Sequence, residues 1–423
     1  MNLLKNSVEF DDNKCVKCTR CITRCKANSV GCLEISLDEN GKKHLTKNEK
    51  SCLGCGQCTI MCPINAIREQ SNLDELRQIL QDKTKVKIVQ CAPAIRTIIP
   101  EKKANTLLRL LGFDKVFDVN FGADITTMVE AEELVERIKN NGTLPMFTSC
   151  CPSWVEYCLV YHPEFKEHLT TARSPNLHAG LAYKTWWAER ENIDTNNIIV
   201  VSVMPCTAKK DEIKRETAKL NGKQIIDIGI TVRELLQLSK EKNIVIDDLD
   251  ETDADTLGEY TGAAVIYGAS GGVMESALRT GYYMMTNENL ADIELKQVRP
   301  EDGFKTAEID IKGQKIKIAV VQTIQNFEKL LPNLKDYHYV EIMNCIGGCL
   351  GGGGMPVLPI KPSDQVAEYS RRREILFDLD KNKTKRKAHE NEYVNEYFKW
   401  IDSKNDKHFE HICKHNDWKL NLT

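Results

Sequence analysis

Cysteines carry the clearest chemical signal in this sequence. Residues 15–25 and 52–62 each contain a run with the spacing C-x2-C-x2-C-x3-C. A 4Fe–4S cubane needs four thiolate ligands, and spacings this short let one loop deliver three while the other run supplies the fourth. Structural zinc is the alternative, but zinc sites favour two separate C-x2–4-C pairs. The spacing therefore predicts two 4Fe–4S clusters.

Each predicted cluster combines three cysteines of one run with one of the other. Pro63 follows the last cysteine of the second run, as this pattern expects, whereas Lys26 stands in the matching place of the first. Cys32 is left over, and we expect a small buried residue there. The predicted ligands are Cys15, Cys18, Cys21 and Cys62 for the first cluster, and Cys52, Cys55, Cys58 and Cys25 for the second.

Basic residues crowd the first run, and two interpretations stay open. They could dock an acidic electron carrier beside the cluster. They could equally form a solvated face that offsets the negative charge of a thiolate-ligated cluster. The residues are Lys14, Lys17, Arg20, Arg24 and Lys26.

Three further motifs hold five cysteines, one more than a cubane requires. The motifs are TSCCPSW at 148–154, MPCTAKKDE at 204–212 and EIMNCIGGCLGGGGMP at 341–356. The glycines of the last motif lack side chains, so the backbone can approach a bulky cofactor closely. The motifs therefore predict a cofactor site beyond the two cluster runs.

The elements that must position these motifs alternate between strands and helices. Short apolar runs predict strands, and 3.6-residue patterns predict helices between them, which together favour an α/β architecture. Each cysteine motif follows a predicted strand, at the end where ligand sites gather in open α/β sheets. The predicted strands are 85–90, 115–119, 145–149, 197–205, 263–268 and 337–343, the helices include 124–140 and 231–243, and 305–322 reads as a hairpin turning at Lys312–Gly313.

Composition bounds the remaining possibilities. The chain has 423 residues, 41% hydrophobic and 28% charged, which is typical of globular proteins of two or three domains. The formal net charge of -3 gives no sign of a nucleic-acid partner. No apolar run is long enough to insert into a membrane, and the N-terminus carries acidic residues instead of the apolar core of a signal peptide. We therefore expect a cytoplasmic protein.

With all three motifs present and in order, the sequence resembles the iron-only (FeFe) hydrogenases over nearly its whole length. The segment KRKAHEN near the C-terminus resembles that family's small subunit, here fused to the large one. We expect an α+β bacterial-ferredoxin-like domain over 1–78 and a helical C-terminal extension over 362–423. Between them, over 79–361, we expect an α/β catalytic domain whose two sheet-containing lobes enclose the active site.

The resemblance implies an H-cluster, in which a 4Fe–4S cubane is joined through one cysteine sulfur to a diiron unit that carries CO, cyanide and azadithiolate. It implies reversible conversion of protons and electrons to H2, with a ferredoxin-type electron carrier and maturation proteins for the diiron unit as partners. By motif, the cubane ligands are Cys151, Cys206, Cys345 and Cys349, and the last supplies the bridge.

The resemblance also assigns a proton route. Cys150, the spare thiol, matches the family's proton donor, and a thiol titrates close enough to neutrality to pass protons both ways. Glu130 and Glu133 share a helical face, with Arg137 one turn on, and match the relay to the surface together with Thr170. By themselves these acidic residues would be interpreted as a solvated helix face.

Further residues match the pocket around the diiron unit. Lys209 matches the lysine that bonds a cyanide ligand, and the expected walls are Met204, Met343, Pro93, Ala94 and Tyr267. Core packing is the alternative for the apolar and aromatic members. The sequence departs from the family pattern at Ser153, Asn176, Ala94, Ala208, Tyr267 and Met355, and no motif role falls to Cys91, Cys158 or Cys413, which we expect to be structural.

Two other functions fit parts of the pattern. A hydrogen sensor with low turnover would keep the same site, but sensors usually carry a signalling domain or lack the proton thiol. A non-catalytic iron–sulfur assembly factor would keep the cubane cysteines and lose the diiron pocket. Cys150, Lys209 and both methionines argue against the assembly factor.

Overall fold

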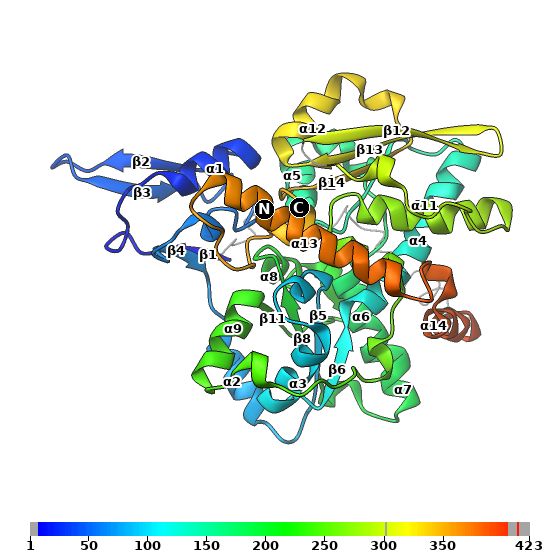
Figure 1. Ribbon diagram of the computed structural model, residues 1–423, viewed down its shortest axis with the longest axis horizontal. Helices are drawn as coiled ribbons and strands as arrows, with labels where there is room; N and C mark the ends of the chain where they lie inside the picture. The colour runs from blue at the N-terminus through cyan, green and yellow to red at the C-terminus, as the bar shows by residue number, and fades with distance from the viewer. Residues whose placement is uncertain (1–6, 301–302, 405–412, 414–423) are drawn as a thin grey trace.

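The computed structural model describes residues 7–300, 303–404 and 413, so parts of the predicted C-terminal extension and of the N-terminus lie outside the described residues. The two cysteine runs belong to a small module with two antiparallel strand pairs, β1 with β4 and β2 with β3. Figure 1 shows the β2–β3 hairpin pointing away from the rest of the molecule. The strands are β1 Val8–Phe10, β2 Leu33–Leu37, β3 Lys43–Lys47 and β4 Ile67–Glu69.

A four-stranded parallel sheet follows, with the order β11-β8-β5-β6. Its strands are rich in apolar residues and are buried almost throughout, as expected for a parallel sheet covered on both faces. The strands are β5 Val86–Cys91, β6 Lys115–Asp118, β8 Ile198–Met204 and β11 Ile228–Thr231.

A second sheet has the order β12-β13-β14-β7, and Figure 1 shows it above the first. Strands β12 and β13 form the predicted hairpin, with Lys312 and Gly313 both at positive φ as a two-residue hairpin turn requires. The remaining pairs are parallel. The strands are β7 Met146–Phe147, β12 Phe304–Ile311, β13 Gln314–Gln322 and β14 Tyr339–Met343, and a short pair, β9 Lys219–Leu220 with β10 Lys223–Gln224, lies outside both sheets.

Helices surround the two sheets, and the long α4 carries three of the predicted site residues. It begins at Asp118, whose side chain accepts a hydrogen bond from Asn120 N at 2.8 Å, an ordinary N-cap. The helices are α1 Arg20–Asn28, α2 Leu73–Gln81, α3 Glu101–Leu111, α4 Val119–Lys139, α5 Pro152–Tyr161, α6 Pro175–Ala182, α7 Ala188–Arg190, α8 Lys209–Glu212, α9 Val232–Glu241, α10 Gly262–Val265, α11 Gly272–Thr286, α12 Ile324–Leu330, α13 Pro362–Asn382 and α14 Glu392–Ser403.

One expected element was wrong, and one strand was missed. Residues 263–268 form α10 and a 3-10 turn where a strand was predicted, because a short, fully buried apolar run looks the same in either state. Thr261 just before this helix donates to Asp124 of α4 from its backbone N at 2.9 Å and its hydroxyl at 2.6 Å. Strand β11 was not predicted.

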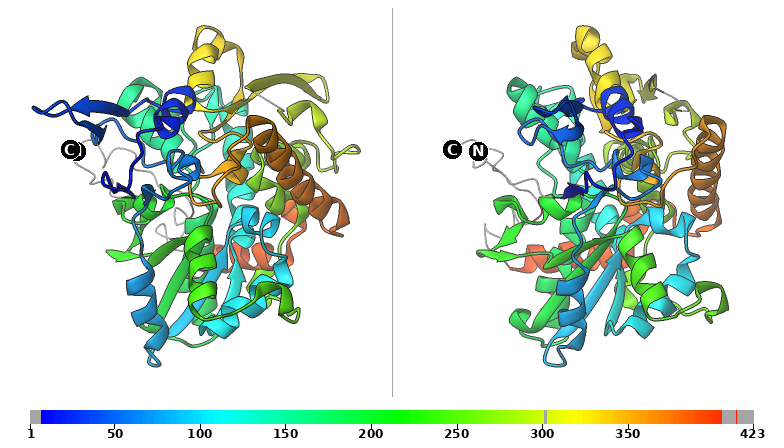
Figure 2. Two further views of the ribbon diagram at one scale, coloured as in Figure 1. Left: turned by 60° about the vertical axis from the view of Figure 1, so that its left-hand side comes forward. Right: turned by 90° about the vertical axis from the view of Figure 1, so that its left-hand side faces the viewer.

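The predicted C-terminal extension contains α13, which takes part in a buried cluster of charged residues. Arg279 of α11 pairs with Asp380 of α13 at 2.8 Å and with Glu275 at 2.6 Å, and all three side chains are fully buried. Breaking such a pair would leave an uncompensated buried charge, so it ties α13 firmly to α11. Figure 2 shows α13 along one outer edge of the molecule.

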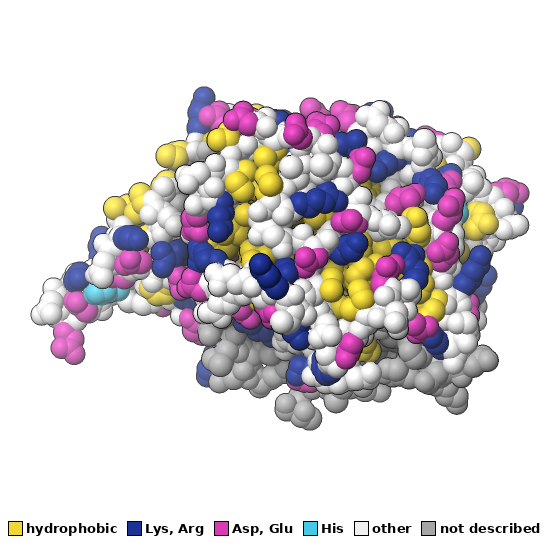
Figure 3. Space-filling view, turned by 90° about the horizontal axis from the view of Figure 1, so that it is seen from below, with side chains coloured by type: hydrophobic (Ala, Val, Ile, Leu, Met, Phe, Trp, Pro, Cys, Tyr) yellow, Lys and Arg dark blue, Asp and Glu magenta, His cyan; other side chains and the backbone are white. Residues whose placement is uncertain are grey.

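No helix within the described ranges is both long and apolar enough to cross a membrane. Figure 3 shows acidic and basic side chains interspersed on one face, without a region of a single sign.

Candidate active site

A mostly apolar cavity lies where strands of both sheets end. Cys150 follows β7, Cys206 follows β8 and Cys349 follows β14, so the two sheets deliver their cysteine motifs to one place. The lining residues are Ala92, Pro93, Val119, Ala123, Cys150, Pro175, Asn176, Met204, Pro205, Cys206, Lys209, Tyr267, Met343 and Cys349. The predicted convergence of the three motifs is confirmed.

The two motif thiols that do not line the cavity are Cys151 and Cys345. They lie near each other and near Cys206. Burial raises the pKa of Cys345 well above its usual range, and the neighbouring Cys206 and Cys151 raise it further. Within the described ranges, no three potential ligand side chains are close enough to hold a single metal ion. Thiols that gather at wider spacing fit a cluster several atoms across, whose irons would keep them as thiolates.

Cys150 has a different environment from the thiols around it. Burial raises the pKa of Cys150 well above its usual range, and the nearby Glu130 carboxyl adds to the rise. Its backbone carbonyl accepts a hydrogen bond from Lys209 Nζ at 3.1 Å. The same ammonium group donates to both carboxylate oxygens of Glu212, each at 2.8 Å. Lys209 therefore stands in the cavity wall with its charge already paired.

Glu130 is a buried acidic residue of α4. Neither of its carboxyl oxygens makes a hydrogen bond of ordinary geometry to another described residue. Burial raises the pKa of Glu130 to about 8, and the nearby Glu133 and Glu341 add to the rise. A carboxyl group with that pKa is mostly protonated at neutral pH, so it can both hold and release a proton.

Glu133, one helical turn away, is saturated with donors. Its Oε2 accepts from Thr170 Oγ1 at 2.8 Å and from the backbone N and hydroxyl of Thr171, each at 2.9 Å. Its Oε1 accepts from Arg137 Nη2 at 2.6 Å. The predicted contacts of Glu133 with Thr170 and Arg137 are therefore present, and Thr171 is a partner that sequence reasoning missed.

An amide group points a spare donor into the cavity. Gln90 Nε2 donates to Asn176 Oδ1 at 2.9 Å, which fixes the orientation of the Asn176 side chain. Asn176 is fully buried, lines the cavity, and its Nδ2 has no hydrogen-bond partner among the described residues. An orphaned donor here fits a polar ligand such as cyanide or CO on a bound diiron unit. Gln90 was not singled out from the sequence, because only the fold brings it to Asn176.

Most, but not all, of the other residues predicted to line the cavity do so. Met204, Met343, Pro93 and Tyr267 line the cavity, whereas Ala94 is fully buried in the core behind it and is not a lining residue. The Tyr267 hydroxyl is 2.8 Å from the Thr127 hydroxyl, which in turn is 2.9 Å from that of Ser276. Among the departures, Ser153, Ala208 and Met355 are also buried.

The two cysteine runs lie in contrasting surroundings. Cysteines of the first run and Cys62 line a surface hollow, and Cys18 is exposed. Cys52 and Cys55 of the second run are buried, as is Cys25.

The spare cysteines also differ from one another. Cys32 is half-buried and its Sγ lies 3.6 Å from that of Cys25, so it borders the second predicted cluster and is not simply a packing residue. Cys91, Cys158 and Cys413 are buried, as expected of structural cysteines.

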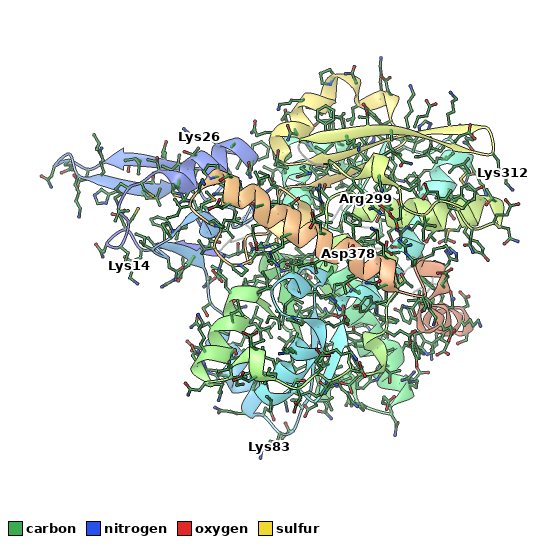
Figure 4. The ribbon with its side chains drawn as sticks, in the orientation of Figure 1. Lys14, Lys26, Lys83, Arg299, Lys312 and Asp378 are labelled. Carbon is green, nitrogen blue, oxygen red and sulfur yellow. The ribbon has the colours of Figure 1, made fainter. Side chains whose placement is uncertain are left out.

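The basic residues near the first run do not form one patch. Lys17 pairs with Asp12, and Arg24 turns inward to donate to Gln57 and to the Tyr369 hydroxyl. Lys14 and Lys26 are exposed, and Figure 4 shows them on opposite sides of the module. A docking surface for an acidic carrier would therefore depend on exposed residues such as Lys14 and Lys26.

Comparisons with known proteins agree with this geometry. The family model described as the iron only hydrogenase large subunit, C-terminal domain, matches residues 85–353, and that of a 4Fe-4S dicluster domain matches residues 8–68.

Individual proteins are also similar. Iron hydrogenase 1 of Clostridium pasteurianum is 40% identical over 91% of this chain and 71% of its own length. The solved structure of apo [FeFe]-hydrogenase HydA1 from Chlamydomonas reinhardtii superposes with a TM-score of 0.70, at 31% identity, over 82% of this chain and 98% of that one. Cytosolic iron-sulfur assembly component 3 of Pongo abelii is 27% identical over 79% of this chain and 77% of its own length.

Proposed function

Because the chain belongs to the iron-only hydrogenases, oxidoreductases that act on hydrogen and carry 4Fe–4S clusters and an H-cluster, we propose that it interconverts protons and H2 in the cavity bordered by Cys150. The single observation that carries the proposal is the convergence of the three cysteine motifs on one buried cavity with a thiol to spare.

In this proposal, the thiols behind and within the cavity wall hold the cubane. They are Cys151, Cys206, Cys345 and Cys349, with Cys349 as the bridging sulfur by its place in the family's motif; Cys206 and Cys349 both line the cavity. When bound, the H-cluster supplies the two-electron chemistry that makes or splits H2. Asn176 presents an unpaired N–H group to the cavity, where it would orient an anionic ligand of the diiron unit, and the Lys209 ammonium in the wall supplies positive charge beside it.

Protons reach the cavity along α4. Arg137 and the Thr170–Thr171 hydroxyls hold Glu133 at the outer end, and Glu130 stands between it and Cys150. Among the described residues Glu130 has no hydrogen-bond partner of ordinary geometry, so a water molecule would complete each link beside it. The Cys150 thiol then delivers the proton at the cavity itself. Thr171 joins Thr170 as a second hydroxyl donor to Glu133.

Electrons enter through the module formed by residues 1–78. The 4Fe–4S clusters held by its two runs supply the electron transfer, and a ferredoxin-type carrier docks near the exposed first run. Lys14 and Lys26 would attract an acidic carrier. We place the protein in the cytoplasm, where maturation proteins would install the diiron unit, and we assign domains at 1–78, 79–361 and 362–423.

The assembly-factor relative raises an alternative that one measurement decides. A non-catalytic assembly protein needs no diiron pocket, whereas this chain gathers Cys150, Lys209, Met204 and Met343 around one cavity. We therefore expect infrared bands from metal-bound CO and cyanide after maturation. Absence of those bands in protein that contains its cubanes would overturn the proposal. A sensor would show the bands with slow turnover.

The Cys150→Ala substitution tests the proton route. We expect unchanged iron content and infrared bands, with H2 turnover reduced by about 10²- to 10⁴-fold because the last proton carrier is missing. Cys158→Ala is the matched control, since Cys158 is a fully buried thiol on α5 that does not line the cavity. Turnover in Cys150→Ala that equals the control would disprove the assignment.

A further inference from the structure

Gln57, which no motif analysis singled out, joins the second cysteine run to the catalytic site. It lies between Cys55 and Cys58, and its side chain is fully buried. Its Nε2 is 3.2 Å from Cys345 Sγ and 2.6 Å from the Gly351 carbonyl oxygen. One side chain of the electron-input module therefore touches the sulfur of a proposed cubane ligand.

The hydrogen-bond network determines which way this amide faces. Gln57 Oε1 accepts from Arg24 Nε at 3.0 Å and from Asn28 Nδ2 at 3.4 Å, and a guanidinium group can only donate. The Gly351 carbonyl on the other side can only accept. Flipping the amide would break contacts on both sides, so its N–H group must point at the Cys345 sulfur.

The surrounding backbone holds this contact in place. A side chain added at Gly56 would meet the Cα of Gly353 at 2.9 Å, so the two loops pack with no room between them. Thr59 Oγ1 donates to the Gly353 carbonyl at 2.7 Å, next to the same joint. In addition, Arg24 Nη2 donates to Tyr369 of α13 at 2.6 Å, so the C-terminal helix helps to hold the arginine that orients Gln57.

We propose that Gln57 is a positioning residue that sets the reduction potential of the cubane and fixes the second cluster run against it. A hydrogen bond to a ligand sulfur stabilises the more negative, reduced state of a cluster and so raises its potential. The inference rests on the proposed function, because it takes Cys345 as a cubane ligand. It gives the electron-input module a direct influence on the catalytic centre.

The test is Gln57→Leu, which keeps the size of the side chain and removes its N–H group. In matured protein, a redox titration followed by infrared and electron paramagnetic resonance spectroscopy should show a lower midpoint potential for the cubane. We expect a shift of the one-electron equilibrium of about tenfold, or 59 mV. Asn28→Ala is the matched control: it removes only the long contact to Oε1 and should leave the potential unchanged.

The outcomes separate this inference from the proposed function. If the unaltered protein lacks CO and cyanide bands, the proposed function fails. If the bands are present and the midpoint in Gln57→Leu equals that of Asn28→Ala, the inference about Gln57 is wrong. Should Gln57→Leu fail to retain iron, Gln57→Met keeps the length of the side chain and adds no charge while losing the donor to sulfur. A lowered midpoint in that variant supports the inference, and an unchanged one overturns it.

Discussion

The two cysteine runs have the same spacing and left-handed backbone at two matching positions, yet different residues occupy those positions. Lys17 and Gly54, each just before the second cysteine, have φ of 56° and 64°. Thr19 and Gly56, each just after it, have φ of 63° and 68°. Wrapping a cluster therefore demands left-handed backbone in both runs, but only the second meets that demand with glycine.

The difference reflects what lies outside each loop. The first run faces solvent, and the side chains of Lys17 and Thr19 have space there. At Gly54 an added Cβ would lie 2.7 Å from Asp211 Oδ2, and Gly56 packs against Gly353. The second run needs glycine for close packing as well as for positive φ. The two runs therefore share their ligand chemistry but differ in surroundings: the first faces solvent, and the second packs against the catalytic domain.

The largest effect expected of adding a single methyl group comes from undoing the docking. Gly56→Ala should destabilise the protein by about 3 kcal/mol, because an overpacked contact adds to the cost of left-handed alanine. Anaerobic calorimetry would show the transition at a lower temperature. Gly41→Ala is the control, since Gly41 also has positive φ but no atom of the described residues lies within 4 Å of an added Cβ. Equal shifts in the two variants would contradict the docking argument.

The stability of the folded protein should also depend on pH, through the buried carboxyl group of Glu130. Its pKa is raised from 4.5 to about 8, so between those values the folded state retains a proton that the unfolded state has released. Stability should therefore fall as pH rises through this window, by up to about 1.4 kcal/mol per pH unit. Glu130→Gln should remove this contribution, as denaturant titrations at pH 5, 6.5 and 8 would reveal. Parallel pH profiles for the two proteins would show that the carboxyl is not held neutral.

Near the exposed first run, surface charge should instead affect the binding of an electron carrier. Combining Lys14→Glu with Lys26→Glu should raise the KM for an acidic ferredoxin about tenfold at low salt, because two attractive charges become repulsive. The rate with a small dye as electron donor should stay at the parental value, since a dye needs no docking surface. A KM for ferredoxin that does not change would exclude these lysines from the docking site.

The smallest effect tests the strained backbone of the first run. Thr19→Gly should stabilise the protein by about 0.5 kcal/mol, because relief of left-handed strain slightly exceeds the entropy lost by glycine. Thr23→Gly is the contrast: Thr23 lies inside α1, where glycine costs about 0.4 kcal/mol more than threonine. Thermal midpoints that move in the same direction for both variants would refute the strain argument.

Much of the candidate site was predictable because its signals are local. Short cysteine spacings define loops that can wrap a cluster, and the carboxyl ends of strands brought the three motifs together as expected. Residues 263–268 were misread because burial removes the periodicity that separates strand from helix. The prediction that Ala94 lines the cavity was wrong, since spacing along the chain does not show which of two neighbouring side chains faces a cavity.

The sequence by itself determined the class of chemistry, because ligand type and spacing along a short loop are enough to specify iron–sulfur clusters and a spare thiol. Only the tertiary structure decided which run faces solvent and which is docked. It also decided the contacts of Gln57 with Cys345 and of Gln90 with Asn176, which join segments far apart in the chain. Such contacts leave no local pattern, because they depend on how whole elements pack.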